Sequence, residues 1–236
     1  MRGNKKKLVK VAKILVVICI GILVWNVGVN VKRVHDYSTD VDKSNVLEYV
    51  TFVGPVSDIN KERVAEALET QVFDAALNYV VNSGGKIVVV FSKDASVREY
   101  LNETYDLGLF KTEYGISGIT IPYRDPFGNI CKVEVVVYAS EMGIGDLAHE
   151  MGHVYDVSHN FISMEDEFMK LYENRANISE KANSQAPAFR DYYESSPKEF
   201  FAEFCKRYIK GQFKRGKNAE TDMVLDYFES LGETVS

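Results

Sequence analysis

The sequence predicts an α+β fold in which a small mixed sheet is combined with several helices. Runs of β-branched residues of strand length alternate with segments whose apolar residues recur every three or four positions. Two predicted strands are joined by a short segment containing Pro and Gly, which indicates a hairpin. The chain of 236 residues is 46% hydrophobic and 26% charged, which is the composition of a globular domain with a substantial core.

The first 31 residues predict a membrane or signal segment. An apolar stretch from Ile14 to Val31 follows a basic run, and this order favours a cytoplasmic N-terminus and export of the remainder. The stretch is close to the minimum length for crossing a hydrocarbon layer of about 30 Å. Because no small-x-small cleavage site follows, an uncleaved anchor is favoured over a cleaved signal peptide. We therefore expect an extracellular protein, secreted or anchored to the cell membrane.

Residues 32–45 are polar and aperiodic and predict a stalk, and residues 46–236 predict one domain. In its first half, Ser57 or Asp58 can cap a long helix, and two glycines can end it. The expected elements of this half are a strand at 46–53, the helix at 57–83, a buried strand at 86–92 and a short helix at 95–105.

The second half of the domain is expected to contain a hairpin and four helices. Ser163, with Asp166 three residues later, signals one helix start, and Ser196 followed by Pro197 signals another. In order, the elements are strands at 115–125 and 131–139, a helix after residue 145, a helix at 163–174, a loop at 177–190, and helices at 196–211 and 219–232.

The segment AHEMGHVYD contains two of the four histidines of the chain. His149 and His153 are four residues apart, so on a helix both imidazoles can reach one zinc ion. Glu150 lies beside them, where it can take a proton from a zinc-activated water. The pattern His-Glu-x-x-His also arises by chance, in about one chain in a hundred of this size. The alternative interpretation of the motif is a solvent-exposed helix face without a metal. The amphipathic helix around the motif favours the zinc site.

A catalytic zinc site needs a third protein ligand, for which the sequence offers carboxylates in two places. Asp156 is near, but it would have to reach around the turn of the same helix. Glu199 and Glu203 lie one turn apart on a helix that is otherwise apolar, where a zinc ion would neutralise them. Glu199 is then the ligand, and Glu203 or Asp156 would support the ligand histidines by accepting hydrogen bonds.

The motif AHEMGHVYD, followed by a tyrosine and then by PKEFFAEF, resembles the catalytic domain of the anthrax lethal factor family, especially its small relatives, the Pro-Pro endopeptidases. The resemblance covers most of the exported part and implies a zincin-like fold and a gluzincin-type zinc metalloendopeptidase. It implies His149, His153 and Glu199 as ligands and Glu150 as general base. Tyr192, seven residues before Glu199, is implied as the donor that stabilises the oxyanion.

Some positions depart from the pattern of the Pro-Pro endopeptidases. Those enzymes use an aromatic loop residue, typically Trp, near the substrate prolines, whereas the single Trp here is Trp25 and only Tyr114 offers a substitute. Lys198 replaces an acidic residue before the ligand glutamate. The sequence therefore predicts a peptidase without specifying a Pro-Pro cleavage site.

The expected partner is a protein or peptide substrate, bound as an extended strand beside residues 131–140. A net charge of −6 argues against a nucleic-acid partner. Cys131 and Cys205 could form a disulfide or remain two free thiols. The alternative function is a non-catalytic surface or toxin-type binding protein that retains a zincin fold, which would need neither Glu150 nor Tyr192.

Overall fold

The structure is a computed structural model that describes residues 40–91, 100, 102–104, 117–139, 146–182 and 187–232, without the side chains of residues 187 and 188. Residues 40–236 form one compact unit. The predicted segment at 1–31, residues 32–39 of the predicted stalk and most of the predicted helix at 95–105 lie outside the described residues. Among those that are described, no helix has the length and apolar content needed to cross a membrane.

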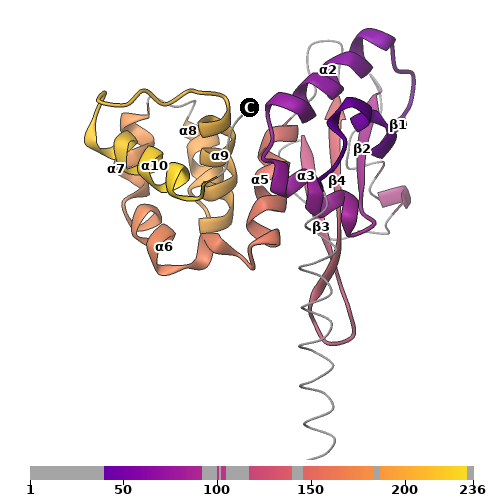
Figure 1. Ribbon diagram of the computed structural model, residues 1–236. Coiled ribbons are helices and arrows are strands. Elements are labelled where there is room, and N and C mark those ends of the chain that lie inside the picture. Colours follow the sequence, from indigo (N-terminus) through magenta and orange to yellow (C-terminus); the bar gives the residue numbers. More distant parts are fainter. Residues whose placement is uncertain are drawn as a thin grey trace, which may run out of the picture. The chain divides into compact units, whose positions relative to one another are not determined.

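Within the described residues, four strands form one mixed sheet in the order β1-β2-β4-β3 (Figure 1). The first three of these are parallel, and β3 pairs antiparallel with β4 as the predicted hairpin. Because β4 is paired on both sides, the expectation that residues 131–140 offer a free edge to a substrate is wrong. The outermost described strand on that side is β3. The strands are β1 (Val50–Val53), β2 (Lys86–Phe91), β3 (Gly118–Arg124) and β4 (Ile130–Ala139).

The domain begins with a 3₁₀ helix, η1 (Lys43–Tyr49), where the sequence predicted the first half of a strand. The Asp42 side chain accepts a hydrogen bond from a backbone N–H two residues later, and this cap favours the helical start. Nearby, the backbone N–H of Val41 donates to Asn78 Oδ1 at 2.8 Å. Residues 40–45, predicted as the end of the stalk, therefore pack with the domain.

The long helix predicted at 57–83 is two helices, α2 (Asp58–Thr70) and α3 (Asp74–Asn82). The Ser57 side chain caps α2 as predicted. Between the two helices, Val72 and Phe73 are both buried, and the Phe73 ring lies 4.7 Å from that of Tyr155. In a continuous helix these adjacent side chains would point about 100° apart. The break lets both face the core.

All regular elements that the structure describes after β4 are helices. The predicted loop at 177–190 is wrong at both ends, because it overlaps α7 and α8; Ile178 of α7 is fully buried, so packing stabilises a segment with weak helical pattern. The elements are α5 (Leu147–Ser158), η2 (Ile162–Met164), α6 (Asp166–Glu173), α7 (Arg175–Lys181), α8 (Pro187–Tyr193), α9 (Pro197–Ile209) and α10 (Ala219–Ser230).

Helix α5 has the central position for the site, because it packs against α3 and the β3–β4 hairpin and also against α9 (Figure 1). Gly152 lies where α5 and α9 meet. A Cβ atom at this position would lie 2.9 Å from Ala202 Cα and 3.0 Å from Ala202 O. These distances are shorter than ordinary van der Waals contact, so the missing side chain is what lets the two helices approach this closely.

Candidate metal centre

His149 and His153 occupy successive turns of α5, as their spacing predicts. Their rings lie 4.8 Å apart at 85°, and both face α9. His149 is buried, whereas His153 is partly exposed. One imidazole is thus fixed by packing while the other borders solvent.

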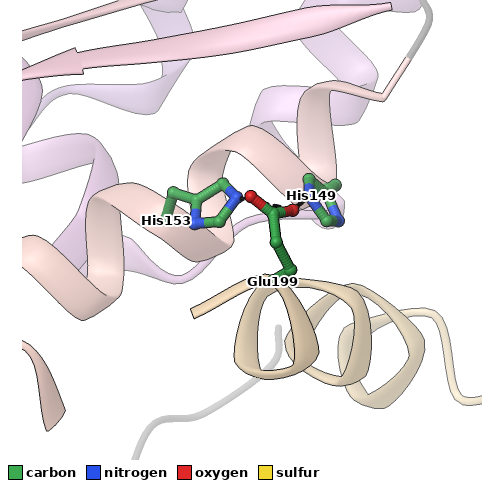
Figure 2. A group of neighbouring side chains, drawn as sticks. All are labelled: His149, His153 and Glu199. Carbon is green, nitrogen blue, oxygen red and sulfur yellow. Dashed lines mark hydrogen bonds and ion pairs between the residues drawn. The ribbon is translucent and has the colours of Figure 1, made fainter. Parts of the chain in front are cut away.

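Glu199 reaches the two histidines from the first turn of α9 (Figure 2). The Ser196 side chain accepts a hydrogen bond from the Glu199 backbone N–H, and this cap fixes where the helix begins. Glu199 Oε2 lies 3.2 Å from His149 Nε2 and 3.4 Å from His153 Nε2. One carboxylate oxygen therefore faces both imidazoles, and the three ligand atoms lie within 4.8 Å of one another.

These residues fit a zinc ion in spacing and in chemistry. Ligand atoms about 2.0–2.1 Å from a tetrahedral zinc lie about 3.3 Å apart, close to the two distances observed. On its other side, His149 Nδ1 lies 3.6 Å from Glu203 Oε2. If Nδ1 carries the proton toward that carboxylate, Nε2 turns a lone pair toward Glu199 Oε2. The two lone pairs would then face each other and need a cation between them, which either a proton on Nε2 or a metal ion can supply.

The charges of the cluster favour a cation. Burial alone would raise the pKa of Glu199, but its hydrogen bonds to His149 and His153 outweigh burial and hold that pKa well below its usual range. Burial would lower the pKa of His149, but its contacts with Glu199 and Glu203 raise it to about 10. The site thus stabilises positive charge between the imidazoles and the carboxylates.

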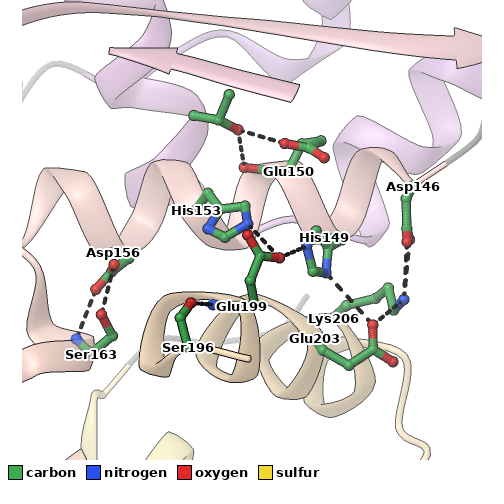
Figure 3. Close-up of polar contacts among 11 residues, drawn as sticks. Asp146, His149, Glu150, His153, Asp156, Ser163, Ser196, Glu199, Glu203 and Lys206 are labelled. Carbon is green, nitrogen blue, oxygen red and sulfur yellow. Dashed lines mark hydrogen bonds and ion pairs between the residues drawn. The ribbon is translucent and has the colours of Figure 1, made fainter. Parts of the chain in front are cut away.

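Glu150 lies on the sheet side of α5, next to β3 (Figure 3). Thr120 Oγ1 lies 2.9 Å from Glu150 Oε2 and 3.0 Å from the Glu150 backbone oxygen. Burial raises the pKa of this carboxyl group. At Gly118, a Cβ atom would lie 2.7 Å from Glu150 Cγ, so β3 can approach the carboxylate only because this residue is glycine. A buried carboxyl group with a raised pKa is better suited than an ordinary carboxylate to take up and return a proton.

Tyr192 lies on α8, with its ring 6.4 Å from that of His149. It is 57% exposed, so part of this side chain borders solvent beside the cluster. Partial burial, together with the negative charge of Glu199, raises its pKa well above the usual range. The phenol is therefore a neutral hydrogen-bond donor at physiological pH.

The two residues expected to support the histidines lie in different places. Glu203 is buried one turn after Glu199 and faces His149 Nδ1 (Figure 3). Asp156 is also buried, but its carboxylate accepts hydrogen bonds from Ser163 N at 2.7 Å and from Ser163 Oγ at 2.8 Å. The structure thus brings Glu203 to the cluster and places Asp156 at the junction of α5 and η2. The prediction that Ser163 starts the next helix is wrong. Its side chain contacts the Asp156 carboxylate, and the N-cap residue of α6 is Glu165.

Sequence reasoning missed three residues that contact the site: Thr120, Asp146 and Lys206. Lys206 Nζ lies 3.1 Å from Asp146 Oδ1 and also pairs with Glu203 (Figure 3). The spacing of Glu203 and Lys206, three residues apart on an apolar helix, is the signal that could have revealed this pair. Thr120 gives no comparable signal, because its contact depends on how the hairpin packs against α5.

The described fold is a mixed α+β domain with a small sheet and a helix that carries the His-Glu-x-x-His motif, compatible with a zincin-like fold. It is similar to the solved structure of the Pro-Pro endopeptidase PPEP-2 from Paenibacillus alvei, with a TM-score of 0.51 and 17% sequence identity. The match covers 79% of this chain and 98% of that one and supports a distant relationship. No family model and no curated protein matches the sequence.

Proposed function

We propose that the protein is a zinc-dependent endopeptidase. The observation that carries this proposal is the convergence of His149 Nε2, His153 Nε2 and Glu199 Oε2, with Glu150 buried beside them. Two histidines and one glutamate form the protein ligand set of a type of catalytic zinc site that leaves a fourth position open. The similarity to PPEP-2, a peptidase, supports the same reaction class.

The ligand residues would hold the metal, and two other side chains would act on the substrate. Bound zinc would lower the pKa of a water molecule and polarise the peptide carbonyl. Glu150, held by Thr120, would take the proton from the attacking water and return it to the leaving amine. Tyr192 would donate its phenolic hydrogen to the oxygen that becomes negatively charged in the transition state.

We propose that the substrate binds as an extended strand along β3. Among the described strands β3 is outermost on this side of the sheet, and it lies directly beside Glu150. An extended peptide could therefore hydrogen-bond to its backbone and pass the cluster. An extracellular location, with attachment to the membrane if residues 1–31 stay uncleaved, is also part of the proposal and rests on the order of basic and apolar residues.

Metal analysis combined with peptide-library cleavage tests the proposal. We expect the purified protein to hold one zinc ion, to cleave peptides, and to lose activity to a chelator until zinc is restored. Glu150→Gln should keep the zinc but lose nearly all turnover, whereas Glu199→Ala should lose both. A protein that binds zinc but cleaves no peptide would support the non-catalytic binding function instead. A protein that binds no zinc would refute the metal centre.

A further inference from the structure

An ionic network, buried except at Asp146, lies behind the candidate metal centre, on the side of His149 that faces away from Glu199 (Figure 3). Lys206 is 8% exposed, and its Nζ lies 3.1 Å and 3.3 Å from the two carboxylate oxygens of Asp146. The same Nζ pairs with Glu203 Oε2, which lies 3.6 Å from His149 Nδ1. One ammonium group thus links the start of α5 to the carboxylate behind a candidate ligand.

Asp146 gives a second, independent indication that this network matters. It is the N-cap residue of α5, where an aspartate normally accepts a hydrogen bond from the first turn of the helix. Here its side chain makes no capping hydrogen bond and is turned toward Lys206. A helix-stabilising contact has been exchanged for one that holds Lys206 in place.

The charges of the network balance. Arg207 Nε donates to Glu203 Oε1 at 2.7 Å, so Glu203 has a cation on each oxygen. The two carboxylates of Asp146 and Glu203 are thus matched by the two cations of Lys206 and Arg207. When a metal takes the place of the proton on Nε2, His149 can direct Nδ1–H toward Glu203, as ligand histidines generally do.

We infer that Lys206 is a positioning residue for the metal centre, acting through Glu203 on the orientation of His149. This inference rests on the proposed metal site and adds a residue to it. Without the ammonium group, Glu203 Oε2 loses its cation and its link to Asp146. Arg207 then holds the carboxylate through Oε1 alone, and Oε2 can turn away from His149 Nδ1. The imidazole then loses the carboxylate that lies 3.6 Å from its Nδ1 and that would accept Nδ1–H when a metal binds Nε2.

The test compares Lys206→Met, which keeps the length but removes the charge, with Lys206→Arg, which keeps the charge. We expect Lys206→Met to weaken zinc binding by about 10- to 100-fold, the usual effect of removing a residue that supports a metal ligand. We expect Lys206→Arg to retain most of the wild-type zinc affinity. The visible spectrum of the Co²⁺-substituted protein, which reports ligand geometry, should change in Lys206→Met and return in Lys206→Arg. Arg215→Met is the matched control, because Arg215 also pairs with two carboxylates, those of Asp226 and Glu229, but on the surface.

A purely structural salt bridge gives a different result. Lys206→Met would then melt at a lower temperature but bind zinc with wild-type affinity and give the wild-type Co²⁺ spectrum, and this result would overturn the inference. If Lys206→Met does not fold, Asp146→Asn decides: weaker zinc binding with an altered Co²⁺ spectrum supports the inference, and unchanged values overturn it. A wild-type protein that binds zinc but cleaves no peptide refutes the proposed catalysis alone, because metal binding still decides the role of Lys206.

Discussion

Replacing Gly152 by Ala tests how closely α5 and α9 must approach to form the metal centre. The new Cβ would lie 2.9 Å from Ala202 Cα and 3.0 Å from Ala202 O, where ordinary contact begins at about 3.5 Å. Both atoms belong to the α9 backbone, so the helix itself has to retreat by about 0.5 Å. Metal–ligand distances tolerate deviations of only about 0.2 Å, and Glu199 lies on the same helix one turn before Ala202.

The expected effect on metal affinity is larger than the effect on stability. Overpacking costs about 1–3 kcal/mol, whereas Gly→Ala in a helix gains about 1 kcal/mol. The two contributions leave a net destabilisation between zero and about 2 kcal/mol. A displaced ligand should weaken zinc binding by about tenfold or more, by analogy with the loss of a partner behind a ligand.

The assay measures zinc affinity by competition with a chelator and stability by urea unfolding of the metal-free protein. Ala67→Val is the control, because Ala67 is buried in α2, which carries none of the ligands. Wild-type zinc affinity in Gly152→Ala would refute the reasoning. An equal loss of affinity in Ala67→Val at the same loss of stability would assign the effect to destabilisation alone.

Three further predictions concern groups around the site and on the sheet. Gly118→Ala should displace Glu150, keep zinc and lower kcat by about 10²-fold; wild-type kcat would contradict the close approach of β3. Tyr192→Phe should also keep zinc and lower kcat by roughly 10²-fold with little change in KM, because the phenol is needed only in the transition state; full activity would exclude that role. Burial and the carboxylate of Glu134 raise the pKa of Tyr123 to about 12, so its stabilising hydrogen bond should be fully present below pH 10 and lost as the pH rises through 12. Ultraviolet titration of the wild type and of Glu134→Gln should show one phenol titrating at lower pH in the variant, and an unchanged titration would contradict the hydrogen bond.

Local rules predicted the parts of the site that lie on single helices. His149 and His153 are one turn apart, so their common direction follows from helix geometry alone. Ser196 followed by Pro197 set the start of α9, and this placed Glu199 in its first turn. The proximity of the two helices themselves was inferred from the chemistry of zinc, which needs a third ligand. These residue roles stay predictions until metal binding is measured.

Features that depend on tertiary packing could not be predicted from the sequence. The apolar periodicity continues through Val72 and Phe73, so nothing local marks the break between α2 and α3. The hairpin pattern predicts that β3 pairs with β4, but it does not say that β2 pairs with the other side of β4. Asp146 and Lys206 are 60 residues apart, and only the packing of α5 against α9 brings them together.

The three proposed ligands lie on two helices, α5 and α9, and the ribosome completes α5 well before α9. His149 and Glu199 are 50 residues apart, so a growing chain that has completed α5 has two of the three ligands and lacks the helix that supplies the third. A chain interrupted before α9 retains the complete His-Glu-x-x-His motif without a closed metal centre. The proposed zinc site can therefore be completed only after translation has passed α9 and this helix has docked at Gly152, so a product truncated before α9 is expected to lack the proposed activity.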